Sequence, residues 1–315
     1  MKLSIVVPCY NEEENVFLFY EEVKKIFKKE SFEYEVIFVN DGSKDKTYQN
    51  LKKIAKENKM NIKVINFSRN FGKEAGIYAG LQEAKGEYIS LIDADMQQDP
   101  SLILEMVDFL EKESDYDSVC MYQEERKEGR VLTFFKKSFY KLINKVSDTK
   151  FVNGASDFRT FRREMKDAIL SMTEYFRFSK GIFSFVGFNT YYKPYIVKER
   201  ATGTSKWSFW KLFSYAIDGI VAFTTAPLKL ATMIGLLSSF ISIVYLIIVI
   251  IQKLCYGITV PGYATIVVLI LLLGGLQLFA LGIIGEYLAR CYVEVKKRPI
   301  YIVKNKIESK KKVNE

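Results

Sequence analysis

Short apolar runs alternate with helical patterns over the first 113 residues of the chain. The runs, which are rich in Val, Ile and Phe, predict β-strands at residues 2–7, 34–39, 62–67 and 87–92. The segments between them predict α-helices at residues 13–29, 46–58, 73–84 and 101–113. A strand and a helix that recur about every 30 residues are typical of β-α-β crossovers. We therefore expect an α/β fold with a mostly parallel sheet covered on both faces.

Two much longer apolar runs occupy the last third of the chain. Residues 230–251 and 263–285 contain 22 and 23 residues, respectively, without one charged side chain. At about 1.5 Å per residue, a helix of either length crosses the roughly 30 Å hydrocarbon core of a bilayer. The sequence therefore predicts two transmembrane helices.

The charges around these runs predict their orientation. The link between them carries only Lys253, whereas residues 286–315 hold nine Lys and Arg against four Asp and Glu. Because basic loops stay on the cytoplasmic side, we expect both flanks and the large N-terminal part of this multi-pass membrane protein to be cytoplasmic. The excess positive charge suits anionic lipid, and no basic recognition helix or aromatic RNA-binding motif points to nucleic acid.

Two further stretches have an interfacial pattern. Both tryptophans, Trp207 and Trp210, lie just before the first apolar run, which predicts an amphipathic helix at the membrane surface. Residues 131–146 interleave aromatic and aliphatic side chains with lysines, which fits either an interfacial helix or an ordinary core-facing one. We expect a cytoplasmic domain, an interfacial helix, a transmembrane pair with a short external loop, and a basic cytoplasmic tail, at residues 1–205, 206–228, 229–285 and 286–315.

Composition narrows the chemistry. The 315 residues carry a formal charge of +9 and include no histidine, which excludes a Ser-His-Asp or Cys-His centre, a histidine-ligated zinc and a histidine general base. The four cysteines are scattered and form no C-x-x-C pair, as expected of reduced cysteines in a reducing compartment.

Polar motifs follow three of the predicted strands, at residues 8–12, 40–43 and 93–95. Ligands of parallel sheets bind at the carboxyl ends of strands. The chain has no G-x-G-x-x-G and no P-loop motif, so the dinucleotide and P-loop interpretations lose their main support. Asp93 and Asp95, with Gln97 two residues on, suit Mg²⁺ or Mn²⁺ and through it a diphosphate, although a pair of aspartates is also common in solvated turns.

An ordered set of motifs resembles family 2 glycosyltransferases of the polyprenyl-phosphate branch, which includes dolichyl-phosphate mannose synthase and the bactoprenol (undecaprenyl-phosphate) glucosyltransferases. The set runs through V-V-P-C-Y-N-E-E, V-N-D-G-S-K-D-K-T, S-R-N-F-G-K-E, D-A-D-M-Q-Q-D-P, S-D-F-R, R-A-T-G-T-S-K-W, P-L-K, G-E-Y-L-A-R and K-R-P, from residue 6 to residue 299. The resemblance implies a GT-A-type, Rossmann-like domain. One departure is that the acid after Gln97 is displaced by one position, to Asp99.

The resemblance also implies roles for individual residues. Pro8, Tyr10, Glu12 and Asp41 would line the nucleotide pocket, and simple strand termination is the alternative for Pro8 and Tyr10. Asp93 would face the ribose and the metal, and Asp95 and Gln97 would be metal ligands. Arg69 and Lys73 would bind the donor diphosphate or simply form a solvated loop face.

Asp157 matches the proposed catalytic aspartate of the family, with a helix cap as the alternative. Cations that offset the repulsion of two phosphorylated substrates would be Arg159, Arg200 and Lys206, and more weakly Arg126. Ser205 would join Arg126, Arg200 and Lys206 at the acceptor phosphate.

The predicted activity is that of an inverting hexosyltransferase. It would move one sugar from a nucleotide-sugar, UDP-glucose first and UDP-N-acetylglucosamine second, to undecaprenyl phosphate, giving a lipid-linked sugar for surface glycans. The acceptor phosphate, with a second pKa of about 6, is largely dianionic at neutral pH, which weakens the case for a general base. A processive polysaccharide synthase should carry Q-x-x-R-W, which is absent here; a catalytically inactive membrane adaptor is the other alternative. A homo-oligomer is compatible with the resemblance.

Overall fold

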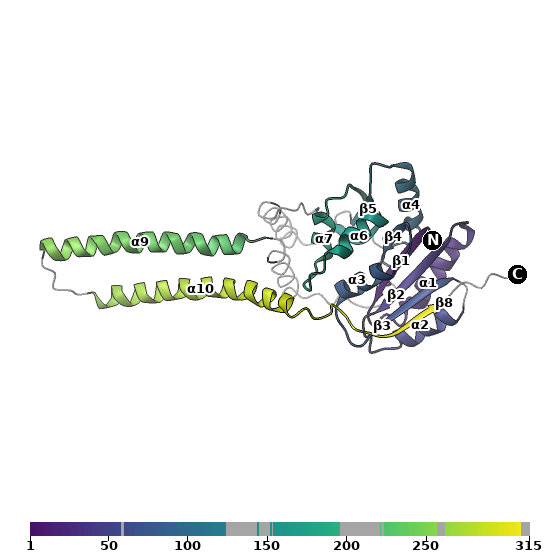
Figure 1. The fold of residues 1–315 in the computed structure, drawn as a ribbon, viewed down its shortest axis with the longest axis horizontal. Coiled ribbons are helices and arrows are strands. Elements are labelled where there is room, and N and C mark those ends of the chain that lie inside the picture. Colours follow the sequence, from purple (N-terminus) through teal and green to yellow (C-terminus); the bar gives the residue numbers. More distant parts are fainter. Residues whose placement is uncertain are drawn as a thin grey trace. The chain divides into compact units, whose positions relative to one another are not determined.

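The computed structural model describes residues 1–57, 60–123, 144, 152, 154–195, 221, 224–256 and 262–309. The chain divides into two units (Figure 1). The first comprises Met1–Lys145, Thr149–Ala216 and Pro299–Glu315, and the second comprises Val146–Asp148 and Ile217–Arg298.

The first unit is built on one mixed sheet. Its strands, in chain order, are β1 (Leu3–Cys9), β2 (Tyr34–Asn40), β3 (Asn61–Phe67), β4 (Tyr88–Leu91), β5 (Ser118–Gln123), β6 (Ala155–Arg162), β7 (Thr190–Tyr195) and β8 (Val303–Ser309). Across the sheet the order is β7-β5-β6-β4-β1-β2-β3-β8. The central four, β4-β1-β2-β3, are parallel, with Leu3 opposite both Tyr34 and Tyr88. These are the four predicted strands, so the parallel core is confirmed.

Helices cover both faces of this core. The four predicted ones are confirmed as α1 (Asn15–Ile26), α2 (Thr47–Lys56), α3 (Lys73–Glu83) and α4 (Leu102–Lys112), and α1 continues into the 3₁₀ turn η1 (Phe27–Lys29). Alternate residues of β1, such as Ile5 and Val7, join the main core with side chains of α1, α2 and α4. The other face of β1 meets α3, where a Cβ on Gly80 would lie 2.2 Å from Val6 Cγ1. Glycine there lets the helix approach the sheet closely.

The flanking strands were not predicted. β6 is antiparallel to β4, β5 is antiparallel to β6, and β7 is parallel to β5. Helices α6 (Arg163–Ser171) and α7 (Ser179–Phe185) lie between β6 and β7 in the sequence. On the opposite edge, β8 is antiparallel to β3. The predicted basic tail therefore contains a strand of the sheet, and its charged sequence V-K-N-K-I-E-S is typical of edge strands.

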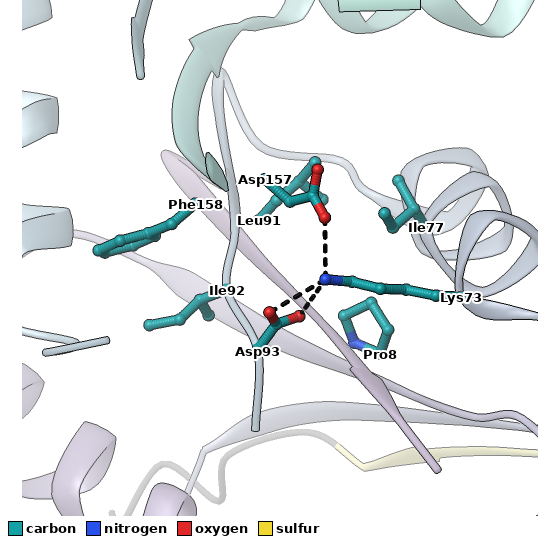
Figure 2. Close-up of a pocket in the computed structure, with 8 residues that line it drawn as sticks. All are labelled: Pro8, Lys73, Ile77, Leu91, Ile92, Asp93, Asp157 and Phe158. Carbon is teal, nitrogen blue, oxygen red and sulfur yellow. Dashed lines mark hydrogen bonds and ion pairs between the residues drawn. The ribbon is translucent and has the colours of Figure 1, made fainter. Parts of the chain in front are cut away.

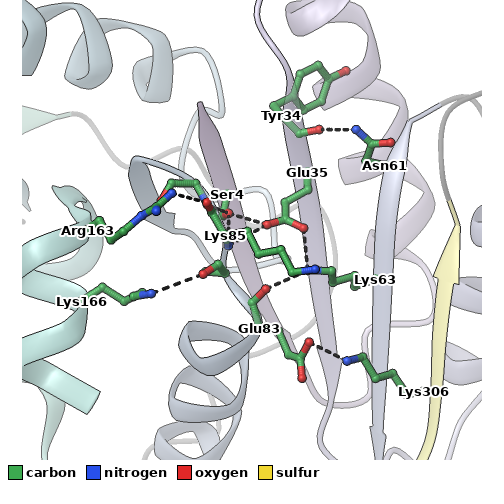
Figure 3. A network of polar contacts seen from close by, with 12 residues as sticks. Ser4, Tyr34, Glu35, Asn61, Lys63, Glu83, Lys85, Arg163, Lys166 and Lys306 are labelled. Carbon is green, nitrogen blue, oxygen red and sulfur yellow. Dashed lines mark hydrogen bonds and ion pairs between the residues drawn. The ribbon is translucent and has the colours of Figure 1, made fainter. Parts of the chain in front are cut away.

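A buried ion pair lies within the parallel core (Figure 3). Lys63 Nζ lies 2.8 Å from Glu35 Oε2, and both side chains are at most 4% exposed. The other carboxylate oxygen accepts hydrogen bonds from Ser4 Oγ and the Lys85 backbone N–H, while Lys63 also donates to the Glu83 carbonyl. The charges are thus compensated by partners on neighbouring elements, as burial requires.

The second unit contains two long helices, α9 (Ala226–Tyr256) and α10 (Tyr263–Val295). They contact each other, and Tyr287 Oη donates to the Thr224 carbonyl over 2.7 Å. Ala226–Gln252 and Val268–Val295 are long and apolar enough to cross a membrane, and their most apolar stretches are not buried by the described protein. The predicted spans lie within α9 and α10, and α10 continues past residue 285 through the pair Glu286–Arg290.

The predicted interfacial helix at residues 206–228 and the stretch at 131–146 lie outside the described residues, apart from Asn144, Val221 and residues 224–228, the last three of which belong to α9. The predicted domain boundaries at residues 205, 228 and 285 stay predictions.

Candidate active site

The sheet topology brings four polar segments to one edge. The parallel strands β1, β2 and β4 end there, and the antiparallel β6 begins there because Leu91 pairs with Arg159. Pro8 lies near the end of β1, Asp41 directly after β2, and Asp93 two residues after β4. Asp157 is the third residue of β6. This edge is where ligands of parallel sheets bind.

Lys73 links two of these acids (Figure 2). Its Nζ, at the start of α3, lies 2.8 Å from Asp93 Oδ1 and 2.9 Å from Asp157 Oδ2. The side chain of Lys73 is 44% exposed, whereas those of Asp93 and Asp157 are 30% and 24% exposed. Apolar side chains complete the small pocket around them, from Pro8, Ile77, Leu91, Ile92 and Phe158. The result is an ammonium held between two carboxylates at the mouth of an apolar pocket.

This arrangement keeps both ends of the Lys73–Asp157 pair charged. Burial acts to raise the pKa of Asp157, but the charges of Lys73, Lys180 and Arg159 outweigh it and hold that pKa well below its usual range. Burial likewise acts to lower the pKa of Lys73, but Asp157 and Asp93 raise it well above its usual value. Asp157 is consequently a poor proton acceptor and a strong anionic partner.

The neighbouring residue, Glu74, is in a different electrostatic state. Its Oε2 accepts hydrogen bonds from the Ser179 backbone N–H, over 3.0 Å, and from the Ser179 hydroxyl. Burial and the negative charge of Asp157 raise the pKa of Glu74 to about 7, against the lowering effect of the Ser179 hydrogen bonds and Lys73. Glu74 thus joins the start of α3 to the start of α7 and titrates near neutral pH.

Asp41 secures the loop that leads into α3. Its carboxylate is buried and accepts the backbone N–H groups of Phe71, over 2.6 Å, and Gly72, over 2.9 Å. Burial raises its pKa, whereas those two hydrogen bonds and Arg69 lower it. The same loop passes so close to Gly42 that a Cβ there would lie 2.2 Å from the Arg69 carbonyl carbon. Position 42 therefore requires glycine for two reasons: a Cβ would overlap this backbone, and its φ is +62°.

The segment after β4 forms a tight turn around its aspartates. Asp95 Oδ1 accepts the Gln97 backbone N–H over 3.1 Å, and Met96 has a φ of +59°. Buried Gln98 accepts the Asp93 backbone N–H through Oε1 over 3.0 Å. No group of three or more Cys, Asp or Glu side chains suited to a metal occurs among the described residues. Two carboxylates nevertheless fit Mg²⁺ or Mn²⁺, because such ions bind through one or two carboxylates plus substrate phosphates and water.

Comparison with known proteins decides what kind of enzyme this edge belongs to. Residues 4–170 match the model of glycosyl transferase family 2, and residues 226–291 match the GtrB C-terminal hairpin. The chain belongs to glycosyl transferase family 2. The predicted glycosyltransferase class and its α/β fold of the GT-A type are confirmed, as is the predicted resemblance to the bactoprenol branch.

Curated relatives match the glycosyltransferase over nearly its whole length. The bactoprenol glucosyl transferase of Shigella phage SfV is 40% identical over 97% of this chain and 99% of its own. The prophage bactoprenol glucosyl transferase homolog of Escherichia coli K12 is 38% identical over 96% of this chain and 99% of its own. Among solved structures, glucosyl-3-phosphoglycerate synthase from Mycobacterium tuberculosis, in complex with Mn²⁺, UDP and glucosyl-3-phosphoglycerate, is 15% identical. It covers 69% of this chain and 76% of its own, with a TM-score of 0.49.

Other predicted site residues of the glycosyltransferase lie around this core. Tyr10 is 40% exposed just after β1, and Glu12 Oε2 accepts Asn15 Nδ2 at the approach to α1. Arg69 is exposed, with its guanidinium carbon 4.0 Å from the centre of the Phe71 ring. The predicted contacts of these three residues with the nucleotide and the diphosphate stay predictions.

Arg159 is buried rather than open to a substrate. Only 4% of it is exposed, Nη2 donates to the Ser156 carbonyl, and the guanidinium carbon lies 3.7 Å from the centre of the Phe183 ring. Its charge still acts on Asp157, which fits a supporting role behind that carboxylate. The other predicted cations and the acceptor hydroxyl, Arg126, Arg200, Ser205 and Lys206, lie outside the described residues.

Sequence reasoning missed three residues of the site. The sequence comparison noted position 98 only because the expected acid lies one residue later. The Gln98 side chain nevertheless accepts the Asp93 backbone N–H. Glu74 and Lys180 were not singled out, although Glu74 was part of the quoted S-R-N-F-G-K-E motif. That motif was the available signal for Glu74. Lys180 is brought to Asp157 by the placement of α7 beside β6, which no local pattern predicts.

Proposed function

We propose that this enzyme transfers a single sugar from a nucleotide-sugar to undecaprenyl phosphate at the cytoplasmic face of the bacterial plasma membrane, with inversion at the anomeric carbon. UDP-glucose is the first candidate donor and UDP-N-acetylglucosamine the second. The proposal draws on the relatives named bactoprenol glucosyl transferase, which this chain matches nearly end to end. The product would be a lipid-linked sugar for modification of surface glycans.

The observation that carries the proposal is the Lys73 ammonium between Asp93 and Asp157. A reaction between a nucleoside diphosphate sugar and a lipid phosphate brings two anions together, and a fixed cation at the strand ends lowers the cost of their approach. Without substrate, the two carboxylates keep this cation in place. When a diphosphate arrives, Lys73 exchanges part of that pairing for phosphate oxygens, and Lys180 adds a second positive charge nearby.

The reaction is a one-step displacement. A phosphate oxygen of the acceptor attacks the anomeric carbon, and the bond from that carbon to the diphosphate oxygen breaks as the new bond forms. The nucleoside diphosphate leaves with the electron pair, and the acceptor becomes a phosphodiester. Because a phosphate monoester is largely dianionic at neutral pH, no proton has to be removed by the protein. The lowered pKa of Asp157 therefore favours a role in orienting the acceptor or the sugar hydroxyls over one as general base.

A divalent cation fits the aspartates that follow β4. We propose that Asp93 and Asp95 hold Mg²⁺ or Mn²⁺, with Gln97 as a further ligand. Such an ion would neutralise charge on the leaving diphosphate. The described residues themselves supply the ordered backbone around it, since Gln98 fixes Asp93 and the turn at Met96 sets the spacing to Gln97.

Helices α9 and α10 would hold the enzyme at its acceptor. Each is long and apolar enough to span a bilayer, and the excess of Lys and Arg beyond residue 285 favours the cytoplasmic side for the catalytic unit. Arg200, Ser205 and Lys206 stay our candidates for binding the acceptor phosphate, with Arg126 as a weaker one.

A transfer assay with the full chain in membranes tests the proposal. Radiolabelled UDP-glucose, UDP-N-acetylglucosamine and GDP-mannose are supplied separately with undecaprenyl phosphate, with and without Mg²⁺ or Mn²⁺. We expect a labelled, acid-labile lipid from one donor, and its loss in Lys73→Gln but not in the control Lys112→Gln, which changes an exposed lysine of α4. No labelled lipid from any donor and no UDP binding by the purified protein would contradict the proposal and favour the inactive adaptor.

A further inference from the structure

The strand that follows the second long helix returns to the catalytic sheet. Six residues after α10 ends at Val295, Tyr301 begins a segment that continues into β8. This segment, residues 301–309, is here termed the return segment. It pairs antiparallel with β3, the last parallel strand before the loop at residues 68–72 (Figure 1). Its register passes from Ser309 opposite Ile62 to Val303 opposite Phe67. The return segment therefore reaches the point where the donor-side loop leaves the sheet.

Tyr301 and its neighbour Ile302 make three contacts there. The Tyr301 ring stacks on Phe67, with centroids 4.8 Å apart and planes inclined by 19°. Its hydroxyl donates to Gln82 Oε1, on the side of α3, over 2.5 Å. The carbonyl of the next residue, Ile302, accepts the backbone N–H of Ser68 over 2.9 Å. One short piece of chain thus contacts the end of β3, the start of the loop and the C-terminal part of α3.

The contacts continue from Tyr301 into the loop. Phe67 packs edge-to-face on Phe71, with ring centroids 5.8 Å apart. The guanidinium of Arg69 lies over the Phe71 ring. The Phe71 backbone N–H is one of the two that Asp41 accepts. Two residues further on, Lys73 carries the ammonium between the two catalytic-edge aspartates. The path from Tyr301 to this ammonium therefore runs through packed rings to Phe71 and from there along the backbone to Lys73.

The loop has little other support from side chains of its own. Ser68, Arg69 and Asn70 are exposed, and Gly72 has a φ of +100° with open space around its Cα hydrogen. The conformation of the loop is defined mainly by the Asp41 carboxylate on one side and by the Phe67–Phe71 ring pair on the other. A ring stacked against Phe67 restricts how that pair can move, and only Tyr301 fills this position among the described residues.

We propose that Tyr301 is a positioning residue for the nucleotide-sugar: it holds the loop at residues 68–72, and through it Arg69 and Lys73, in the conformation that receives the donor diphosphate. This inference rests on the proposed donor site at the strand ends. It gives the return segment a function beyond covering the sheet edge, because the chain beyond the apolar helices completes the donor side of the active site.

The test uses the full chain in detergent or nanodiscs with three variants. Tyr301→Ala removes the ring and the hydroxyl, Tyr301→Phe keeps the ring alone, and Lys306→Ala breaks an exposed ion pair with Glu83 in the same segment, 2.6 Å between charged atoms, away from the loop. Thermal melts confirm that each variant is folded before any other comparison.

Amide hydrogen exchange gives a readout that does not depend on activity. We expect peptides covering residues 68–72 to exchange about tenfold faster in Tyr301→Ala, in line with the loss of an aromatic pair. Tyr301→Phe and Lys306→Ala should resemble the wild type in this region. Unchanged exchange in Tyr301→Ala, or equal acceleration in Lys306→Ala, would overturn the proposal.

Kinetics then separate positioning from general destabilisation. In Tyr301→Ala the KM for the sugar donor, or the Kd for UDP, should rise about tenfold, while the KM for undecaprenyl phosphate stays within about twofold. Tyr301→Phe should recover most of the donor affinity. A parallel rise of both KM values would contradict a donor-side role. A wild-type enzyme that protects the loop but transfers no sugar would count against the proposed function and leave the structural role of Tyr301 supported.

Discussion

The two halves of the catalytic sheet hold their active-site groups in different ways. In the parallel half, β1 to β4, backbone hydrogen bonds fix the key groups: Asp41 accepts two loop N–H groups, and the Asp93 N–H is held by Gln98. In the antiparallel part around β6, side-chain charges do this work. Asp157 is paired with Lys73, and Glu74 fastens α7 through Ser179. Lys73 is the residue at which the two halves meet.

Because of this difference, the two halves of the site should respond to different kinds of substitution. A site held by backbone geometry responds to changes in backbone conformation and packing, and little to charge or pH. A site held by partly exposed and buried ion pairs responds to charge, and a single neutral substitution changes the state of its neighbours. Substitutions in each half should therefore produce distinct signatures, which the following predictions test in decreasing order of effect.

Asp157→Asn should have the largest effect, because it removes the anion that orients Lys73 from the antiparallel side. We expect kcat to fall about 1000-fold, the scale for loss of a preorganised electrostatic group, with the donor KM changed only a few-fold. Initial rates of lipid-linked sugar formation measure it. Asp108→Asn, an exposed aspartate of α4, is the control. A loss of donor affinity as large as the loss of kcat would show that Asp157 belongs to the donor half.

Lys63→Met tests the interior of the parallel half. It leaves Glu35 as a buried, unpaired carboxylate, so the free energy of unfolding should fall by about 3 kcal/mol. The double change Lys63→Met with Glu35→Gln should restore most of this, because the amide oxygen still accepts the bonds of Ser4 and Lys85. Denaturant unfolding of the purified protein gives the values. Equal destabilisation by single and double variants would mean that packing of the lysine stem, rather than its charge, carries the effect.

A pair of glycines in the parallel half tests the dependence on backbone conformation. Gly42→Ala combines a positive φ with a Cβ that would overlap the Arg69 backbone, whereas Gly72→Ala, also at positive φ, meets nothing within 4 Å. We expect Gly42→Ala to cost about 2 kcal/mol of stability and Gly72→Ala about 1 kcal/mol. UDP affinity should fall with the first more than with the second. If both lose the same affinity, the close approach at Gly42 is not what shapes the loop.

The sequence predicted the parallel half well because its signals are local. Each strand there is a short, almost fully buried run, as in Val36 to Val39, and each is followed by a helix. Asp41 and Asp93 belong to polar motifs at the ends of such strands, which must share one edge, and Lys73 was nominated by the family resemblance. The sharing of Lys73 by Asp93 and Asp157 could not be predicted, because this pairing depends on where β6 joins the sheet.

The flanking strands escaped prediction for a physical reason. β6 reads A-S-D-F-R-T-F-R and β8 reads V-K-N-K-I-E-S, so polar and charged residues break the apolar pattern of both. Their strand conformation comes from pairing with β4 and β3, with partners at least 68 residues apart in the chain. β-Structure is set largely by such neighbours, and a single sequence without partners carries little of that information. The role proposed here for Tyr301 was hidden by the same cause.

Glu74 offers the finest test, because its effect depends on pH. Its pKa of about 7 in the folded protein exceeds its ordinary value of 4.5. Protonated Glu74 is therefore the favoured form in the native state, and its contribution to stability is complete below about pH 4.5 and is lost as the pH rises through 7. Glu74→Gln keeps an acceptor for Ser179 without the charge. Relative to the wild type, it should gain about 1 kcal/mol of stability between pH 6.5 and pH 8.

The chain makes this comparison unusually clean, since it has no histidine to titrate in the same interval. Unfolding of the wild type and Glu74→Gln at pH 5.5, 6.5, 7.5 and 8 measures the difference, with Glu105→Gln as a control at an exposed glutamate of α4 that pairs with Lys193. Parallel stability curves for the wild type and Glu74→Gln would show that Glu74 titrates outside this range. A divergence that grows with pH would assign the neutral-pH sensitivity to Glu74, in the ion-paired half of the sheet.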